Sequence, residues 1–118
     1  MKEDTSRWVR RSDGDLAGAA IMQREAMPAH AVFYCQQAIE KLLKALWIER
    51  LGTVPPRTHS LRALAKNLQL PLTHDQATLL HNLTYDYTPS RYPDVGIMDI
   101  EYDLQDTAKY LTETQEFY

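Results

Sequence analysis

Six prolines divide this chain of 118 residues, and their positions limit its fold more than any other feature. They stand at positions 28, 55, 56, 71, 89 and 93. Proline lacks a backbone N–H and its ring clashes with the preceding turn, so it is tolerated at a helix start but not in a helix interior. The stretches between the prolines are therefore the candidate helices. None of them shows the sustained alternation that is typical of a β-strand.

Two long helices are predicted, over residues 5–26 and 28–51. Pro28 suits the first position of the second helix, and Gly52 supplies a left-handed residue to end it. The second helix carries a continuous apolar stripe formed by Val32, Cys35, Ile39, Leu42, Leu43 and Leu46. It should be the central helix. Two glycines in the first helix, at positions 14 and 18, predict a close approach of the neighbouring helix.

Three shorter helices follow. Thr58 is predicted to cap the third, which carries Leu61, Leu64, Ala65 and Leu68. The run from Thr73 to Gln76 reads as a capping box that opens the fourth. Asp99 is predicted to cap a last helix whose inward face would hold Ile100, Leu104, Ala108 and Leu111. The fold class is therefore all-α, an up-and-down antiparallel bundle of about five helices, built as a single domain over residues 1–118.

Composition narrows the function classes. The formal charge is −3, so nucleic acid could be attracted only by a local basic patch. Cys35 is the only cysteine, which excludes an internal disulfide and suits a reducing compartment. No window has the roughly 20 apolar residues that a membrane span needs. We expect a cytoplasmic protein without membrane contact, without a cofactor, and without a metal, since His74 and His81 lack an acidic third ligand.

The middle of the second predicted helix is polar where its ends are apolar. Glu40 and Lys44 stand four residues apart on the face that also carries Phe33 and Trp47. One interpretation is a surface ion pair of small energetic weight. The other makes both residues part of a polar pocket or of a dimer seam.

The segment from Tyr85 to Asp94 places one arginine among three tyrosines and two prolines. Arg91 offers a planar fork for phosphate, and a tyrosine ring offers a face for a base. The alternative is an ion pair between Arg91 and Asp86 or Asp94 that stabilises a turn. The candidate ligand-binding residues are therefore Glu40, Lys44, Tyr87, Arg91, Tyr92 and Asp94.

His59 follows Thr58 directly at the start of the third predicted helix. An imidazole there could serve as a general base or contact a phosphate. It could also be a first-turn residue with only local contacts. Arg91 and His59 are the candidate catalytic residues.

Four ordered blocks of the chain resemble the HEPN family, the small helical domains of higher eukaryotes and prokaryotes that are associated with nucleotide binding. The blocks are Trp8 with Asp15-Leu16, Phe33 with residues 36–45, residues 58–61, and residues 90–94. The resemblance implies a helical bundle that commonly dimerises and is often encoded beside a minimal nucleotidyltransferase. It also implies a relation to metal-independent ribonucleases of toxin systems.

This chain departs from the pattern of the nuclease-active members of that family. They have a histidine four to six residues after the arginine, whereas those positions after Arg91 hold Val95, Gly96 and Ile97. No histidine occurs after His81. Without that imidazole, the group that would activate a ribose 2′-hydroxyl is missing.

Three functions follow as hypotheses. The first is a non-catalytic module that binds a nucleotide or single-stranded RNA and partners a minimal nucleotidyltransferase in a toxin–antitoxin pair. The second is a metal-independent, toxin-like ribonuclease that uses Arg91 with a non-standard base such as His59. The third is a structural homodimer formed through apolar residues such as Trp8, Trp47 and Phe33.

Overall fold

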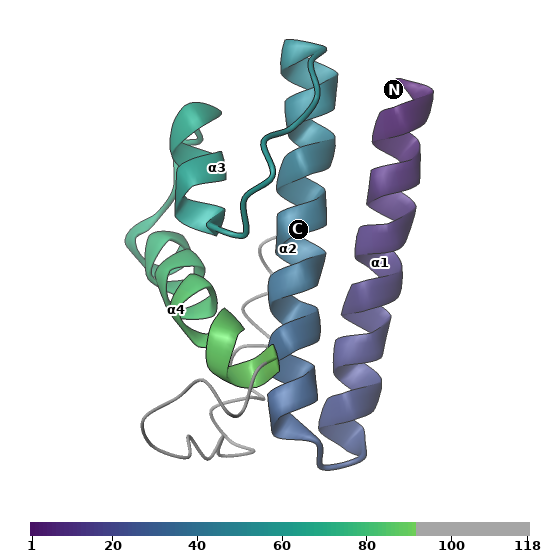
Figure 1. The fold of residues 1–118 in the computed structure, drawn as a ribbon, viewed down its shortest axis with the longest axis vertical. Helices are drawn as coiled ribbons and strands as arrows, with labels where there is room; N and C mark the ends of the chain where they lie inside the picture. The colour runs from purple at the N-terminus through teal and green to yellow at the C-terminus, as the bar shows by residue number, and fades with distance from the viewer. Residues whose placement is uncertain (92–118) are drawn as a thin grey trace.

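The computed structural model describes the backbone of residues 1–91 and the side chains of residues 1–83. This part of the chain forms four helices and no strand: α1 (Glu3–Arg24), α2 (Pro28–Leu51), α3 (Leu61–Asn67) and α4 (His74–Arg91). Helices α1 and α2 lie side by side as an antiparallel pair, and α3 and α4 pack on α2 away from α1 (Figure 1). The predicted all-helical bundle is confirmed. The helix expected after Asp99 lies outside the described residues.

Helix α2 is the centre of the fold, as its apolar stripe predicts. Pro28 occupies its first turn, and Gly52 ends it in the left-handed region with a φ of 67°. The N–H of Gly52 donates to the carbonyl oxygen of Ile48 at 2.9 Å. Every side chain that contacts the apolar core from this helix is buried or half-buried, among them Val32, Cys35, Ile39, Leu43 and Leu46.

The interface between α1 and α2 includes small and polar side chains. Ala19 is fully buried, and the buried Ser12 hydroxyl donates to the carbonyl oxygen of Ala38 at 2.6 Å. The two glycines of α1 do not mark a close approach. A Cβ on Gly18 would meet the Tyr34 ring at 3.7 Å, an ordinary contact, and one on Gly14 would meet nothing within 4 Å. That prediction is wrong, because both positions have room for a Cβ and the small residues buried against α2 are Ser12 and Ala19.

Helix α3 begins at a different cap from the one predicted. Ser60, not Thr58, is its N-cap, and the Ser60 hydroxyl accepts from the N–H of Ala63 at 3.2 Å. Thr58 stabilises the approach to the helix, since its hydroxyl accepts from the N–H of Ser60 at 3.1 Å. The expected apolar face is confirmed, with Leu61, Leu64, Ala65 and Leu68 buried.

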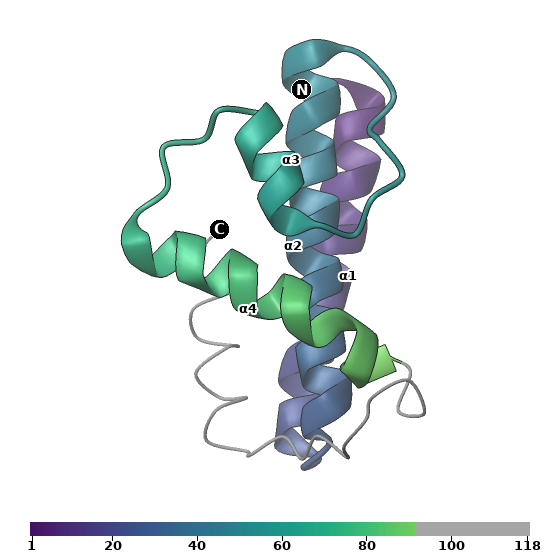
Figure 2. The ribbon, with the colours of Figure 1, turned by 60° about the vertical axis from the view of Figure 1, so that its left-hand side comes forward.

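Helix α4 begins at the predicted capping box. The Thr73 hydroxyl accepts from the N–H of Gln76 at 3.1 Å, and the Gln76 side chain accepts from the N–H of Thr73 at 3.0 Å. The helix crosses α2 obliquely, as Figure 2 shows, and packs on it through Leu79, Leu80 and Leu83.

Helix α4 also runs past Pro89, where a break was predicted. The missing N–H of Pro89 leaves the carbonyl oxygen of Tyr85 without its i to i−4 hydrogen bond, and the helix ends two residues later, at Arg91. The backbone from Tyr85 to Arg91 is therefore helical rather than a turn.

Candidate functional site

A buried carboxylate lies at the middle of α2. The Glu40 side chain is 6% exposed, and Lys44, one turn later, is 11% exposed. The Lys44 ammonium lies 3.3 Å from Glu40 Oε2, and Gln36, one turn earlier, donates from Nε2 to Glu40 Oε1 at 3.1 Å. The ion pair between Glu40 and Lys44 is confirmed, but its predicted surface position is wrong. Trp8 of α1 and His59 of the α2–α3 connection cover this face of the helix.

His59 is bound to this cluster from outside α2. Its Nδ1 lies 2.8 Å from Glu40 Oε1, and its carbonyl oxygen accepts from Gln36 Nε2 at 3.1 Å. The side chain of His59 is nevertheless 56% exposed. Helix α2 thus fixes both the backbone and the ring of His59. The interpretation of His59 as a residue with only local contacts is wrong, since Glu40 is 19 positions away in the sequence.

This arrangement orients an imidazole. A carboxylate on Nδ1 favours the tautomer that carries its proton there, so that in the neutral ring Nε2 is the acceptor. A histidine set in this way can take up a proton, and once protonated it can bind an anion. Lys44 offsets the charge of Glu40, because two buried charges are tolerated when they are paired and hydrogen-bonded.

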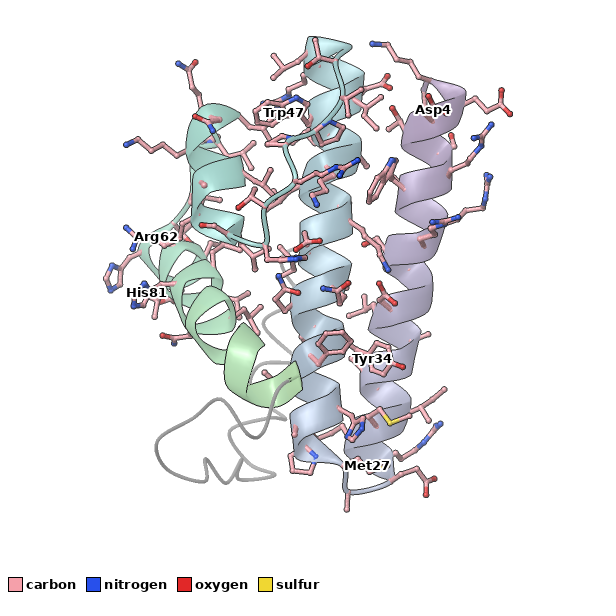
Figure 3. The ribbon with its side chains drawn as sticks, in the orientation of Figure 1. Asp4, Met27, Tyr34, Trp47, Arg62 and His81 are labelled. Carbon is pink, nitrogen blue, oxygen red and sulfur yellow. The ribbon has the colours of Figure 1, made fainter. Side chains whose placement is uncertain are left out.

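The polar cluster continues across to α1. The Lys44 ammonium lies 5.9 Å from the centroid of the Trp8 ring, within the range of a cation–π contact. Gln37 extends the cluster along α2, where its Nε2 donates to Gln36 Oε1 at 2.7 Å. In Figure 3 the labelled Tyr34 and Trp47 mark the two ends of this stretch of α2. A connected set of polar contacts thus joins His59, α2 and α1.

A second ion pair lies nearby between the same two helices. Lys41 of α2 binds Asp15 of α1, and both side chains are mostly buried. Lys41 follows Glu40 directly in the sequence, but the two side chains have different partners: Lys41 pairs with Asp15 and Glu40 pairs with Lys44. This pair helps to hold α1 in the position that places Trp8 over Lys44.

The structure brings together only some of the predicted site residues. Glu40, Lys44 and His59 form one cluster. Tyr87 and Arg91 belong to the last turns of α4, but their side chains lie outside the described residues, as do Tyr92 and Asp94. The sequence interpretation missed the part that Gln36 plays. Its spacing of four residues before Glu40 was the available signal, because it places both on one helix face.

The structure also has a hollow of about 410 Å³, which lies away from the Glu40 cluster. It is formed by α1, the second half of α2 and the α3–α4 connection, and its walls are mostly aliphatic. None of Glu40, Lys44 and His59 lines it. It offers few polar groups that could orient a ligand, so the candidate site is the cluster around Glu40.

Within the described residues, no group of three or more histidine, cysteine, aspartate or glutamate side chains is arranged to hold a metal ion. His81 lies on the outer face of α4, where its Nδ1 is 3.2 Å from the Arg62 guanidinium (Figure 3). None of α1 to α4 is long and apolar enough to span a bilayer. The single domain, the cytoplasmic location and the homodimer stay predictions.

Comparisons with known proteins agree with this architecture. One solved structure, TT1696 from Thermus thermophilus, matches with a TM-score of 0.83 and 26% identity, over 98% of this chain and 93% of that one. A second, ST0689, described as an archaeal HEPN homologue, matches with a TM-score of 0.73 and 28% identity, over 98% and 92%. No curated protein matches the chain.

The family comparison covers nearly the whole sequence. The model of the HEPN domain matches residues 5–118. The match includes every residue of the Glu40 cluster together with the segment around Arg91. Since both the family model and the solved structures agree with the observed helices, this chain belongs to the HEPN domain family.

Proposed function

We propose that this chain binds a nucleotide or single-stranded RNA at the surface around His59, and that it does so as a binding and interaction module rather than as a nuclease. The observation that carries the proposal is the contact of 2.8 Å between the exposed ring of His59 and the buried carboxylate of Glu40. Membership of the HEPN family supports the ligand class.

The energetics of the cluster favour a role in binding. A buried ion pair adds little to stability compared with an apolar pair of similar size. Placing Glu40 and Lys44 inside the bundle therefore needs another reason, and the positioning of His59 supplies one. Arg57, two residues before His59, is exposed on the same connection. An imidazole and a guanidinium on one short loop suit a phosphate group.

The sequence favours binding without cleavage. No histidine follows Arg91 at the spacing of the nuclease-active members. The likeness to the family also supports a minimal nucleotidyltransferase as the partner, in a toxin–antitoxin pair, and a homodimer as the assembly.

A second candidate function rests on the same contact. Because Glu40 orients the ring through Nδ1, His59 has the arrangement of a general base. In a ribonuclease it would take the proton of the ribose 2′-hydroxyl, and Arg91 would stabilise the phosphate.

One set of variants separates the two candidates. A labelled single-stranded RNA is titrated into the parent, His59→Ala, Glu40→Gln and His74→Ala, and each mixture is then analysed for cleavage. His74 is an exposed histidine outside the cluster and serves as the matched control. We expect intact RNA throughout, and an affinity reduced roughly tenfold, or about 1.4 kcal/mol, only in the first two variants.

The outcomes are distinct. Cleavage by the parent that is lost in His59→Ala but kept in His74→Ala would establish the ribonuclease instead. If the parent neither binds nor cleaves RNA or nucleotides, the proposal is wrong. Melting temperatures measured alongside show whether each variant is folded.

The partner is tested by co-expression with the product of the adjoining gene. A minimal nucleotidyltransferase that co-purifies with the chain would support the pairing, and growth of cells expressing each gene alone and both together would identify the toxin. A neighbouring gene of another class would reject this part of the proposal.

A further inference from the structure

A second surface feature lies on the first turns of α1. A hollow of 160 Å³ is lined by Asp4, Arg7, Trp8 and Arg11. Residues at these spacings share one face of a helix. Asp4 is labelled near the N-terminal end of α1 in Figure 3. The hollow therefore combines one aromatic ring, two guanidinium groups and one carboxylate on a single regular element.

The Trp8 ring packs on its inner side against Lys44 of α2. Its side chain is half-buried, and the Lys44 ammonium lies 5.9 Å from the ring centroid. Lys44 is in turn paired with Glu40 at 3.3 Å. The indole is thus fixed by the same cluster that orients His59, and an ordered ring loses less entropy when a ligand stacks on it.

The two arginines of the hollow differ in their partners. Arg7 binds Glu3 at 3.2 Å and Asp4 at 3.5 Å, so its charge is already offset. Arg11, one turn further along, is exposed and makes no ion pair within residues 1–83. Arg11 is therefore the guanidinium that an incoming anion would meet. Asp4 and Glu3 repel an anion that approaches Arg7, which directs it further toward Arg11.

We propose that this hollow is a subsite for one nucleotide unit of single-stranded RNA, in which a base stacks on Trp8 and a neighbouring phosphate binds Arg11. The inference rests on the function proposed above and adds a second contact zone to it. Bases stack on aromatic rings with little regard to sequence, and a guanidinium binds phosphate through a planar fork. A hollow of this volume takes a single heterocyclic ring, so stacking there suits an unpaired base and not a duplex.

Fluorescence can report the stacking directly. The chain has two tryptophans, and the Trp47 indole donates to Thr53 at 3.1 Å, outside the hollow. The substitution Trp47→Phe leaves Trp8 as the only tryptophan, so the tryptophan fluorescence then reports on the hollow. A short single-stranded RNA is titrated into Trp47→Phe, and an abasic strand of the same length is titrated in parallel. We expect quenching by the RNA and none by the abasic strand, which keeps the phosphates but has no bases.

Affinities of variants then test the two contacts. We expect Trp8→Ala to bind the RNA about tenfold more weakly and Trp8→Phe to lie between it and the parent. Arg11→Ala should bind several-fold more weakly, with a shallower dependence on salt. Arg10→Ala is the matched control, because Arg10 is exposed on the same helix but does not line the hollow. Its affinity should equal that of the parent.

The possible failures point to different errors. If the parent binds RNA and Trp8→Phe, Trp8→Ala and Arg11→Ala bind it equally well, the subsite is wrong and the proposed function stands. If the parent binds no RNA, the proposed function fails and the subsite fails with it. The inference would also be overturned if the parent showed no measurable binding to RNA but bound an acidic peptide, and Arg11→Ala removed that peptide binding. Should Trp8→Ala not fold, Trp8→Phe, Arg11→Ala and the abasic strand test the subsite without it.

Discussion

Around Ala38 and Lys41, helix α2 meets α1 through small and polar groups, whereas toward α3 and α4 it presents large aliphatic side chains. On the first side Ser12 donates to Ala38, and Lys41 binds Asp15. On the other side the packed side chains include Ile39, Leu43, Leu61, Leu64, Leu79, Leu80 and Leu83, each 2% exposed or less. One helix therefore joins two kinds of interface.

The two sides of α2 contribute differently: the aliphatic side mainly stabilises the fold, and the polar side mainly positions the candidate site. Aliphatic burial drives folding in proportion to the area removed from water and tolerates many arrangements. Hydrogen bonds and ion pairs depend on direction, so the polar side holds its partners in defined positions. The candidate site lies where α2 is polar, and the leucine layer provides the rigid support behind it.

The largest effect should come from the aliphatic side. Leu80 is fully buried, so we expect Leu80→Ala to lower the free energy of unfolding by about 2–5 kcal/mol. Urea titration followed by circular dichroism measures the loss. Ile21→Ala is the control, because Ile21 is 43% exposed and should cost about 0.5 kcal/mol or less. Equal losses in the two variants would contradict the comparison.

A smaller effect is expected at the interface with α1. The Ser12 hydroxyl donates a buried hydrogen bond to the carbonyl oxygen of Ala38, and Ser12→Ala should lower the free energy of unfolding by about 1 kcal/mol. The same urea titration applies, with Ser6→Ala on the same helix as the control. A loss as large as that of Leu80→Ala would show that the polar side contributes as much to stability as the leucine layer.

The smallest effect should occur at the end of α2, where Glu49 joins it to α1. The N–H of Lys2 and the hydroxyl of Thr5 donate to Glu49 Oε2 at 3.0 and 2.8 Å. Both hydrogen bonds lower the pKa of this carboxyl, and the bond from Lys2 has the larger effect. Since the pKa is lowered in the folded state, the stabilisation is present above the ordinary glutamate value of about 4.3 and is lost as the pH falls through the folded value.

Replacement of this carboxyl tests that contribution. We expect Glu49→Gln to melt slightly below the parent at pH 7, and the gap to close in acid. Melting temperatures between neutral and acidic pH measure it, and Glu25→Gln, at an exposed position beyond α1, is the control. A gap that widens in acid would show that Glu49 acts in another way.

Several elements were predictable because their signals are local. Pro28 and Gly52 mark the ends of α2, and the capping box at Thr73 opens α4 as expected. Thr58 and Ser60 both suit a cap, and only the path of the connection selects Ser60. Pro89 lies within the last turn of α4, so the positions of the prolines did not by themselves mark the end of this helix.

Periodicity and capping act within a few residues along the chain, so the sequence alone was enough to predict the four described helices, the central place of α2 and their aliphatic faces. The burial of Glu40 and Lys44 and the contact of His59 with Glu40 depend on the tertiary structure. Those contacts arise when the α2–α3 connection folds back along α2 and α1 covers its polar stretch. A face that is polar in the sequence can be exposed or covered, and long-range packing makes that choice.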